Sequence, residues 1–430
     1  MKPEHTAADT LRVLLMATTF PRWEDDTMPQ FVYELSKELN TQSVDVVVLA
    51  PHYPGAERKE TMSGITVYRY PYMFPYRYQK IALQGNGGIL PSLKQSPIAL
   101  LQLPVLIASL VAHTVWIYKK ERIDVINSHW LLPNGVIAGA LATLFDSRHV
   151  MTLHARGVLL IQRLPFGSVL AASAYRWSDA ILPVSRDIQD RFIAAANGAI
   201  DGTEKFQVQP MGAHTSEYDT DAKGRLRAER NVDDTVRGLF VGRLADKKGI
   251  RYLLDAIADA EFTADAFRLT VVGSGPLEDD LRRYAEELDL GEQVAFTGWV
   301  SEAELQDQYV LSDFVVVPSI ETDSGDTEGM PTVIAEAFAA GNPVVATTVG
   351  GIPDVVSDGT NGYIVPQKQP AELAEAMSRL IDNPARREEL SDGALATAAE
   401  LDWSRCAEQY ARTLQDVQGP TAATHSETLV

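Results

Sequence analysis

The sequence predicts an α/β protein made of two doubly wound, Rossmann-like domains, and three observations support this prediction. The chain has 430 residues, of which 45% are hydrophobic, which exceeds what one core usually organises and is ample for two. Short apolar runs alternate with longer helical patterns, as in sheets of buried parallel strands. Two such series occur, and a charge-rich stretch at 218–234 separates them.

The first series opens with the strand-like run LRVLLMATTF and a helix from about Pro29 to Leu39. It continues with the runs VDVVVLA, IDVINSH, HVMTLH and DAILPVS. The second series contains RGLFVGRL, FRLTVVGSG, QVAFTG, DFVVVPS, NPVVATT and NGYIVP. The expected parts are a first domain at 1–217, a linker at 218–234, a second domain at 235–396, a closing helix at 397–417 that packs back toward the first domain, and a flexible tail at 418–430.

Composition narrows the classes of partner and the compartment. The formal net charge of −20 argues against nucleic acid, because phosphate backbones select basic surfaces. A single cysteine, Cys406, permits no internal disulfide and fits a reducing compartment. The polar start MKPEHTAADT does not resemble a signal peptide. We therefore expect a cytoplasmic protein.

Two doubly wound domains that face each other create a cleft, with ligands at the carboxyl ends of the strands. A dinucleotide-dependent dehydrogenase needs a glycine-rich turn after its first strand, but LLMATTFPRWEDD contains no glycine. The later run VVGSGPLEDDL has only Gly273 and Gly275, which serve equally well as a tight turn between a strand and a helix. These features disfavour a dehydrogenase.

The segment TEGMPTVIAEAF places two carboxylates eight positions apart around a Gly-Met-Pro turn. Pro331 is suited to the first helical position, so the turn Gly329–Pro331 leads into a helix N-terminus that favours anions and polar oxygens. Glu328 precedes this helix and Glu336 lies inside it, so both can face one elongated ligand at different heights. Alternatively, Glu328 caps the helix and Glu336 lies on its surface.

A second polar group follows the first strand of the second series, in GLFVGRLADKKGI. A guanidinium at Arg243 and an ammonium at Lys248, placed at a strand end, suit a diphosphate. Together with the carboxylates of the TEGMP segment, they offer a phosphate clamp and a hydroxyl-binding site. This combination indicates a nucleotide sugar as the ligand.

The chain resembles the retaining glycosyltransferases of family 4, the group 1 type with the GT-B fold. The resemblance rests on GRLADKKG, VGSGPLEDDLR, VAFTGWV, VVVPS, EGMPTVIAEAFAAGNPVVAT, GGIPDVV and NGYIVP in family order, and it covers most of residues 11–415. It implies transfer of a hexose-type sugar from a UDP- or GDP-sugar to a glycan or lipid-linked acceptor, with retention of configuration. The segment VAFTGWV, which contains Gly298, would flank the nucleotide base.

The resemblance also implies roles for the polar residues of the second domain. Arg243 and Lys248 would hold the donor pyrophosphate. Glu328 and the Gly329–Pro331 segment, including Met330, would bind the hydroxyls of the transferred sugar, and Glu336 would bind the ribose.

The first domain resembles the family less closely, and it would bind the acceptor. Its first loop, FPRWEDDTMPQFVYEL, lacks the paired glycines that many members bring against the donor phosphate. The segments NSHWLLPNGV and MTLHARG resemble two further family segments. The resemblance implies that His154 is a catalytic residue that contacts the donor sugar; the alternative is a buried structural histidine. Arg156 and His129 are acceptor candidates, although His129 also suits a structural place.

The sequence predicts neither a cofactor nor a metal site. Metal-dependent transferases often use an Asp-x-Asp pair, and the literal match at 219–221 lies in the predicted linker. Leaving-group charge would then be stabilised by preorganised cations and helix N-termini. Two alternatives share the fold: a sugar-nucleotide epimerase, and a non-catalytic subunit of a glycan-assembly complex.

A basic and aromatic segment at 61–123 stands out in this acidic chain. It contains one acid, Glu121, the aromatic run YRYPYMFPYRY, and a charge-free run at 98–118 that is long enough to span a bilayer. Spanning would break one sheet, so the segment is either a buried helix beside an aromatic loop or a face that docks on the anionic inner surface of the cell membrane. The basic residues are Arg69, Arg77, Lys80, Lys94, Lys119, Lys120 and Arg122.

Overall fold

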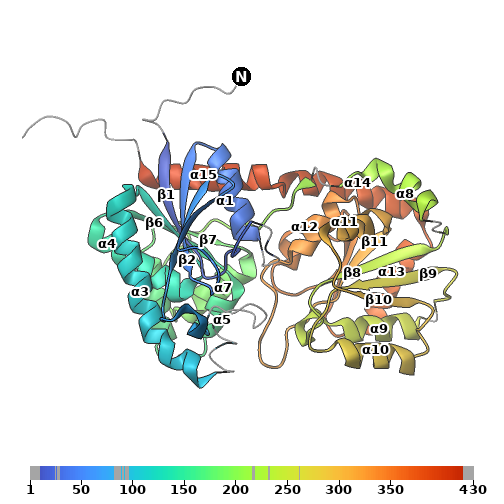
Figure 1. Cartoon of the computed structure of the whole chain (residues 1–430). Helices are drawn as coiled ribbons and strands as arrows, with labels where there is room; N and C mark the ends of the chain where they lie inside the picture. Colours follow the sequence, from blue (N-terminus) through green and yellow to red (C-terminus); the bar gives the residue numbers. More distant parts are fainter. Residues whose placement is uncertain are drawn as a thin grey trace, which may run out of the picture. The chain divides into compact units, whose positions relative to one another are not determined.

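The structure is a computed structural model that describes residues 10–24, 26, 30–81, 89, 92, 96–215, 218–230, 233–260 and 262–419. The chain divides into two compact units, the first made of 1–184, 188–209 and 406–430 and the second of 185–187 and 210–405. Each unit is a parallel-sheet α/β domain (Figure 1). The predicted fold class is confirmed.

The strands are β1 (Leu11–Met16), β2 (Val44–Pro51), β3 (Lys59–Met62), β4 (Ile65–Tyr70), β5 (Val125–His129), β6 (Arg148–Leu153), β7 (Ala180–Pro183), β8 (Val236–Val241), β9 (Phe267–Val272), β10 (Val294–Gly298), β11 (Phe314–Val317), β12 (Val344–Thr347) and β13 (Gly362–Val365). The helices are α1 (Phe31–Thr41), α3 (Pro97–Glu121), α4 (Val136–Phe145), α5 (Ala155–Ile161), α6 (Gly167–Arg176), α7 (Arg186–Ala195), α8 (Lys223–Glu229), α9 (Ile250–Asp259), α10 (Glu278–Glu287), α11 (Glu302–Leu311), α12 (Thr332–Ala339), α13 (Pro370–Ile381), α14 (Pro384–Glu400) and α15 (Trp403–Gln418).

In the described part of the first unit, seven strands form one sheet in the order β3-β4-β2-β1-β5-β6-β7. Only β3 runs antiparallel to its neighbour. Leu14 of β1 and Val47 of β2 are adjacent in the parallel register, and both are fully buried in one core cluster with residues of α3 and α4. The apolar face of α3 therefore covers this sheet.

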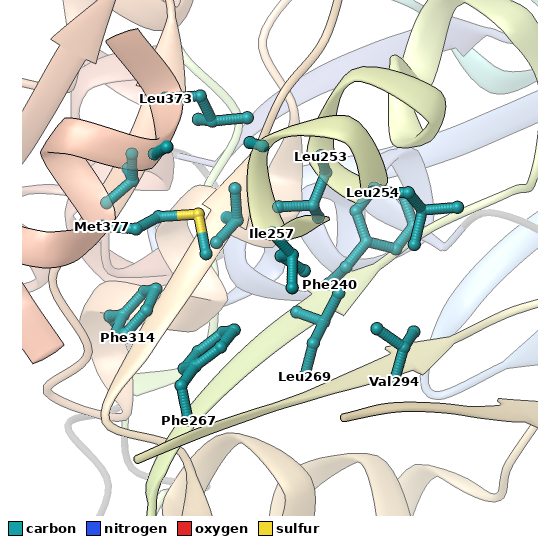
Figure 2. Packing of buried hydrophobic residues seen from close by; sticks show 14 of the residues in the cluster. Phe240, Leu253, Leu254, Ile257, Phe267, Leu269, Val294, Phe314, Leu373 and Met377 are labelled. Atoms are coloured by element: carbon teal, nitrogen blue, oxygen red, sulfur yellow. The ribbon is translucent and has the colours of Figure 1, made fainter. Parts of the chain in front are cut away.

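The second unit contains a six-stranded parallel sheet in the order β10-β9-β8-β11-β12-β13. Figure 2 shows Phe240, Phe267 and Phe314 of the sheet beneath Leu253 of α9 and Met377 of α13. Strands β11 and β12 are buried along their whole length, as expected where helices cover both faces of a parallel sheet. The winding reverses between β8 and β11, so the carboxyl ends of these two strands form the switch point, where such sheets bind ligands.

The predicted linker at 218–234 is wrong in part, because it contains a packed helix. Helix α8 contacts α11, and Lys223 at its start lies 3.0 Å from the carboxylate of Asp313. The boundary between the units falls instead at 209–210. Charged residues of this stretch form ion pairs, so their presence does not indicate an exposed linker.

The predicted closing helix at 397–417 is two helices, α14 and α15. Asp402 separates them, and its carboxylate accepts a hydrogen bond of 2.9 Å from the backbone N–H of Ser404. Residues from 406 onward belong to the first unit, where the hydroxyls of Tyr410 and Thr152 are 3.1 Å apart. This return to the first unit confirms the expected path. The predicted tail at 418–430 falls, apart from Gln418 and Gly419, outside the described residues.

Candidate active site

The switch point of the second unit holds an ion-pair cluster between the buried Glu328 and the half-buried Lys247 and Lys248. Lys248 Nζ lies 3.1 Å from Glu328 Oε1, and Lys247 Nζ lies 3.6 Å from Oε2. Burial by itself raises the pKa of Glu328, but the two ammonium groups outweigh it and hold that pKa below its usual value. Glu328 is therefore an ionised carboxylate at neutral pH.

Several polar atoms around this cluster have unused hydrogen-bonding capacity. Glu328 Oε1 is paired with Lys248 Nζ, but among the described residues Thr327 Oγ1 and Ser319 Oγ have no hydrogen-bond partner. Both hydroxyls are buried, and an unsatisfied buried polar atom is costly. A ligand that carries hydroxyl groups would satisfy them.

Arg243 lies two residues beyond β8 and is exposed. Its loop is fixed by the glycine turn after β9, where Leu244 N–H donates a 3.0 Å hydrogen bond to Ser274 O. Gly273 has φ +129°, and a Cβ there would lie 2.0 Å from Gly242 O. The glycines of the VVGSGPLEDDL run therefore position the loop that carries Arg243, as expected of a tight turn.

Helix α12 begins at Thr332, so the prediction that Pro331 is the first helical residue is wrong by one position. Pro331 is extended, with φ −69° and ψ 118°, and it has no N–H to offer a ligand. The donors in this segment are Gly329 and Met330, whose backbone N–H groups make no hydrogen bond within the described part of the chain. The first turn of α12 adds the N–H groups of Thr332 and Val333, whereas Ile334 N–H already donates a 3.1 Å hydrogen bond to Pro331 O.

Two further residues that were predicted to bind the nucleotide-sugar donor, Glu336 and Gly298, lie on different elements of the second unit. Glu336 lies on α12, and its carboxylate accepts a 2.7 Å hydrogen bond from the hydroxyl of the buried Tyr309. Gly298 ends β10, and its carbonyl accepts a 2.8 Å hydrogen bond from Gly273 N–H. Gly298 thus adjoins the turn that supports Arg243, whereas Tyr309 fixes the carboxylate of Glu336.

The first unit has a second polar cluster at the ends of β5 and β6. His129 Nδ1 lies 3.1 Å from His154 Nε2, and the two rings stack. The ring of Trp130 lies 4.7 Å from that of His154, and Trp130 has a positive φ of 66°, a strained conformation that often marks functional sites. Arg156 is exposed in the first turn of α5. The structure thus joins His129 and His154 in one hydrogen-bonded pair.

Burial keeps these histidines neutral, which predicts a sign for the pH dependence of stability. Burial lowers the pKa of His154 to about 3 and that of His149 to about 4, and it lowers the pKa of His129 well below its usual value. Below about pH 6.5 these histidines bind protons in the unfolded chain but not in the folded chain. The free energy of unfolding therefore falls as the pH is lowered.

Lowering the pH from about 7 to about 5.5 should reduce the free energy of unfolding by about 1 kcal/mol for each of these histidines. Urea denaturation followed by circular dichroism at both pH values measures this loss. His149, which hydrogen-bonds Ser128 and Ser178, is the residue to replace, because His149→Gln keeps polar partners and cannot titrate. An unchanged pH dependence in His149→Gln would contradict the prediction.

Four residues of the two sites were not among those predicted: Lys247, Thr327, Ser319 and Trp130. Lys247 adjoins Lys248 in the sequence, and the doublet in ADKKG was a usable signal, because a 3₁₀ turn at Asp246–Lys248 brings both side chains to Glu328. Thr327 and Ser319 carry no such signal, since only the fold shows that their hydroxyls are buried. Trp130 gave a partial signal as an aromatic residue beside His129.

The fold and the second-unit site define a class: a doubly wound α/β protein that holds cations and unsatisfied hydroxyl-binding oxygens at its switch point. The family models agree, because "Glycosyl transferases group 1" matches residues 224–396 and "Glycosyl transferase 4-like domain" matches residues 27–201. Together the two matches span most of the chain. The chain belongs to the group 1 glycosyltransferases.

Individual relatives support this membership. An uncharacterized glycosyltransferase from Methanocaldococcus jannaschii is 29% identical over 67% of this chain and 74% of its own length. A GDP-mannose-dependent α-(1-6)-phosphatidylinositol monomannoside mannosyltransferase from Mycobacterium tuberculosis is 25% identical over 86% of this chain and 89% of its own. The structure of sucrose-phosphate synthase from Thermosynechococcus elongatus, at 21% identity, has a TM-score of 0.73 over 94% of this chain and 98% of that one. This structure shares the fold.

Proposed function

We propose that this glycosyltransferase moves a hexose-type sugar from a UDP- or GDP-sugar to a glycan or lipid-linked acceptor, with retention of configuration and without a metal ion. The observation that carries the proposal is the Lys247–Lys248–Glu328 cluster, which places two cations beside a buried, ionised carboxylate at the switch point. A nucleoside diphosphate sugar needs both features, because it joins a dianionic group to a ring of hydroxyls.

The residues of the second unit have distinct roles in this proposal. Arg243 and Lys248 stabilise the charge that develops on the leaving diphosphate, assisted by the N–H groups at the start of α12. Glu328 accepts hydrogen bonds from sugar hydroxyls, the N–H groups of Gly329 and Met330 donate to them, and Glu336, positioned by Tyr309, accepts from the ribose.

Glu328 is poorly suited to act as a nucleophile, because two ammonium groups stabilise its negative charge. The proposed reaction therefore takes place on one face of the sugar. The bond from the anomeric carbon to the diphosphate breaks, and the acceptor oxygen bonds to that carbon from the same side. The hydroxyl proton of the acceptor passes to an oxygen of the leaving phosphate.

In the first unit, the neutral His129–His154 pair provides uncharged hydrogen-bonding groups for substrate hydroxyls. Burial keeps both rings unprotonated at neutral pH, so the pair orients a substrate without adding charge. Arg156 is the proposed acceptor contact. The single cysteine and the acidic charge of the chain support a cytoplasmic place for the reaction.

The test is to incubate the purified protein with UDP- and GDP-hexoses and to follow nucleotide release with and without candidate acceptors. Binding of the correct donor alone should raise the melting temperature, because a ligand of the native state stabilises it. Release should depend on an acceptor, and EDTA should leave the rate unchanged. Metal-reversible inhibition would contradict the metal-independent mechanism, and conversion of the donor without any acceptor would favour an epimerase.

A further inference from the structure

Helix α3 is apolar on the side that faces solvent as well as on the side that faces the core. Its inward residues, among them Leu106, Leu110 and Ile117, are fully buried. The outward residues recur every three or four positions, which places them on one face of the helix. They form what we call the outer stripe: Leu101, Val105, Ala108, Ala112 and Trp116. Leu101 is 78% exposed.

The segment after β4 adds aromatic residues beside this stripe. Gln102 of α3 accepts a hydrogen bond from Lys80 N–H at 3.0 Å and donates one to Tyr78 O at 2.7 Å. These bonds hold the segment against the helix. Phe74, which is 80% exposed, and Tyr78 both present their rings to solvent. Large apolar and aromatic side chains exposed on two neighbouring segments indicate an interaction site.

A cationic pocket of about 450 Å³ adjoins the outer stripe and shares Ala112 and Trp116 with it. Lys120 Nζ lies 4.4 Å from the ring centroid of Trp116 and donates a 3.1 Å hydrogen bond to the hydroxyl of Tyr68. The pocket is lined by Arg58, Lys59, Tyr68, Arg69, Ala112, His113, Trp116 and Lys120.

The pocket carries more positive than negative charge. Arg69 is neutralised by Glu60, and Lys120 lies 3.8 Å from Glu121. Arg58, in contrast, has no carboxylate partner among the residues that the structure describes, and Lys59 interacts with the hydroxyl of Tyr68 and, at longer range, with Glu121. Both Arg58 and Lys59 are exposed. Guanidinium and ammonium groups around an aromatic wall suit a phosphate. The size of the pocket is in the range of ligand sites.

We propose that the first unit docks on an anionic membrane, with a phospholipid phosphate headgroup in this pocket and the outer stripe of α3 in the interfacial layer. Aromatic side chains favour the bilayer interface, and basic residues are attracted to anionic headgroups. An interfacial helix places its apolar side toward the acyl chains, which the outer stripe of α3 would do here.

Two observations favour docking on an anionic membrane over non-specific adsorption and over insertion of α3 across the bilayer. The net charge of −20 repels an anionic surface, so only a local basic site can bind one. By length and composition alone, α3 is the one helix within the described ranges that is long and apolar enough to cross a membrane, and 28% of its apolar window is buried. The buried part belongs to the core under the sheet, so α3 lies along the membrane surface. The proposal is independent of the donor site.

The experiment is sedimentation of the full chain with vesicles of phosphatidylcholine alone, and with vesicles that also contain phosphatidylglycerol. The charge variant is Arg58→Glu/Lys59→Glu/Lys120→Glu. Its matched control reverses three exposed arginines elsewhere, Arg176→Glu/Arg225→Glu/Arg412→Glu, and so has the same net charge. The stripe variant is Leu101→Ser/Val105→Ser. Circular dichroism melts confirm that each variant folds.

We expect the wild type and the matched control to sediment with anionic vesicles only, and to be released at about 0.5 M salt. The charge variant and the stripe variant should each bind these vesicles at least about tenfold more weakly than the wild type. Equal weakening by the matched control would overturn the proposal, because it would show a non-specific charge effect.

Two further outcomes would also overturn it. If inorganic phosphate stabilises the wild type in a thermal melt and no vesicles bind, the pocket holds a soluble phosphate instead. If light scattering shows a dimer that the stripe variant converts to a monomer, again without vesicle binding, a second copy of the chain covers the stripe.

Discussion

Replacing Lys248 or Glu328 by alanine is expected to lower kcat/KM for sugar transfer by about 10²- to 10³-fold, since each removes a preorganised charge from the reacting site. Lys248→Ala removes a cation from the leaving diphosphate, and Glu328→Ala removes the carboxylate that holds the sugar hydroxyls. Arg243→Ala should have an effect in the same direction. Initial rates of nucleotide release, with the donor found in the activity assay, measure the loss.

The control must separate catalysis from stability, because the buried Glu328 forms an ion pair with Lys248. Lys223→Ala breaks another ion pair of the same unit, the 3.0 Å contact with Asp313. Asp313 directly precedes β11, whereas Glu328 follows it, so the control lies at the opposite end of the strand. Lys223→Ala should lower the melting temperature and leave kcat/KM unchanged. Near-normal turnover in all three site variants would show that the donor site has been assigned to the wrong residues.

Replacing Arg69 by alanine is expected to reduce the free energy of unfolding by about 3–5 kcal/mol, because it leaves a carboxylate without its buried partner. Arg69 is one of the seven basic residues of the predicted docking face, but the structure buries it and pairs it with Glu60, so it forms part of the pocket wall without offering an exposed charge. It is 2% exposed, and its Nη2 lies 2.7 Å from Glu60 Oε1 and donates a 2.7 Å hydrogen bond to Pro21 O. Arg69 therefore ties β4 to the loop after β1.

Urea denaturation at neutral pH measures this effect, with Arg77→Ala as the control. Arg77 lies in the same basic segment, but it is exposed, and within the described part of the chain its side chain contacts the neighbouring Tyr78. Its removal should therefore change the free energy of unfolding by less than about 0.5 kcal/mol. The double variant Arg69→Met/Glu60→Met should recover part of the stability, since it removes both charges. A loss below about 1 kcal/mol in Arg69→Ala would show that the buried pair is not needed.

The sequence by itself determined the two α/β series and the segments that carry the second-unit site. Local patterns suffice for this, because runs of apolar residues specify buried strands and the residues that follow a strand stay at its carboxyl end. Arg243, Lys248 and Glu328 were predicted in this way, although 80 residues separate Lys248 from Glu328. The position of Gly298 at the end of β10 follows from the same rule.

Only the tertiary structure decided the partners and the exposure of individual side chains. The chemical type of a residue does not determine which surface of the protein will cover it. The structure buries the charged Arg69, leaves the outer stripe of α3 facing solvent, and places in the predicted linker a helix that is paired with Asp313. The hydroxyl of Tyr309 on Glu336 and the pairing of His129 with His154 likewise join residues far apart in the chain. Such contacts depend on how separate elements pack, which no local pattern encodes.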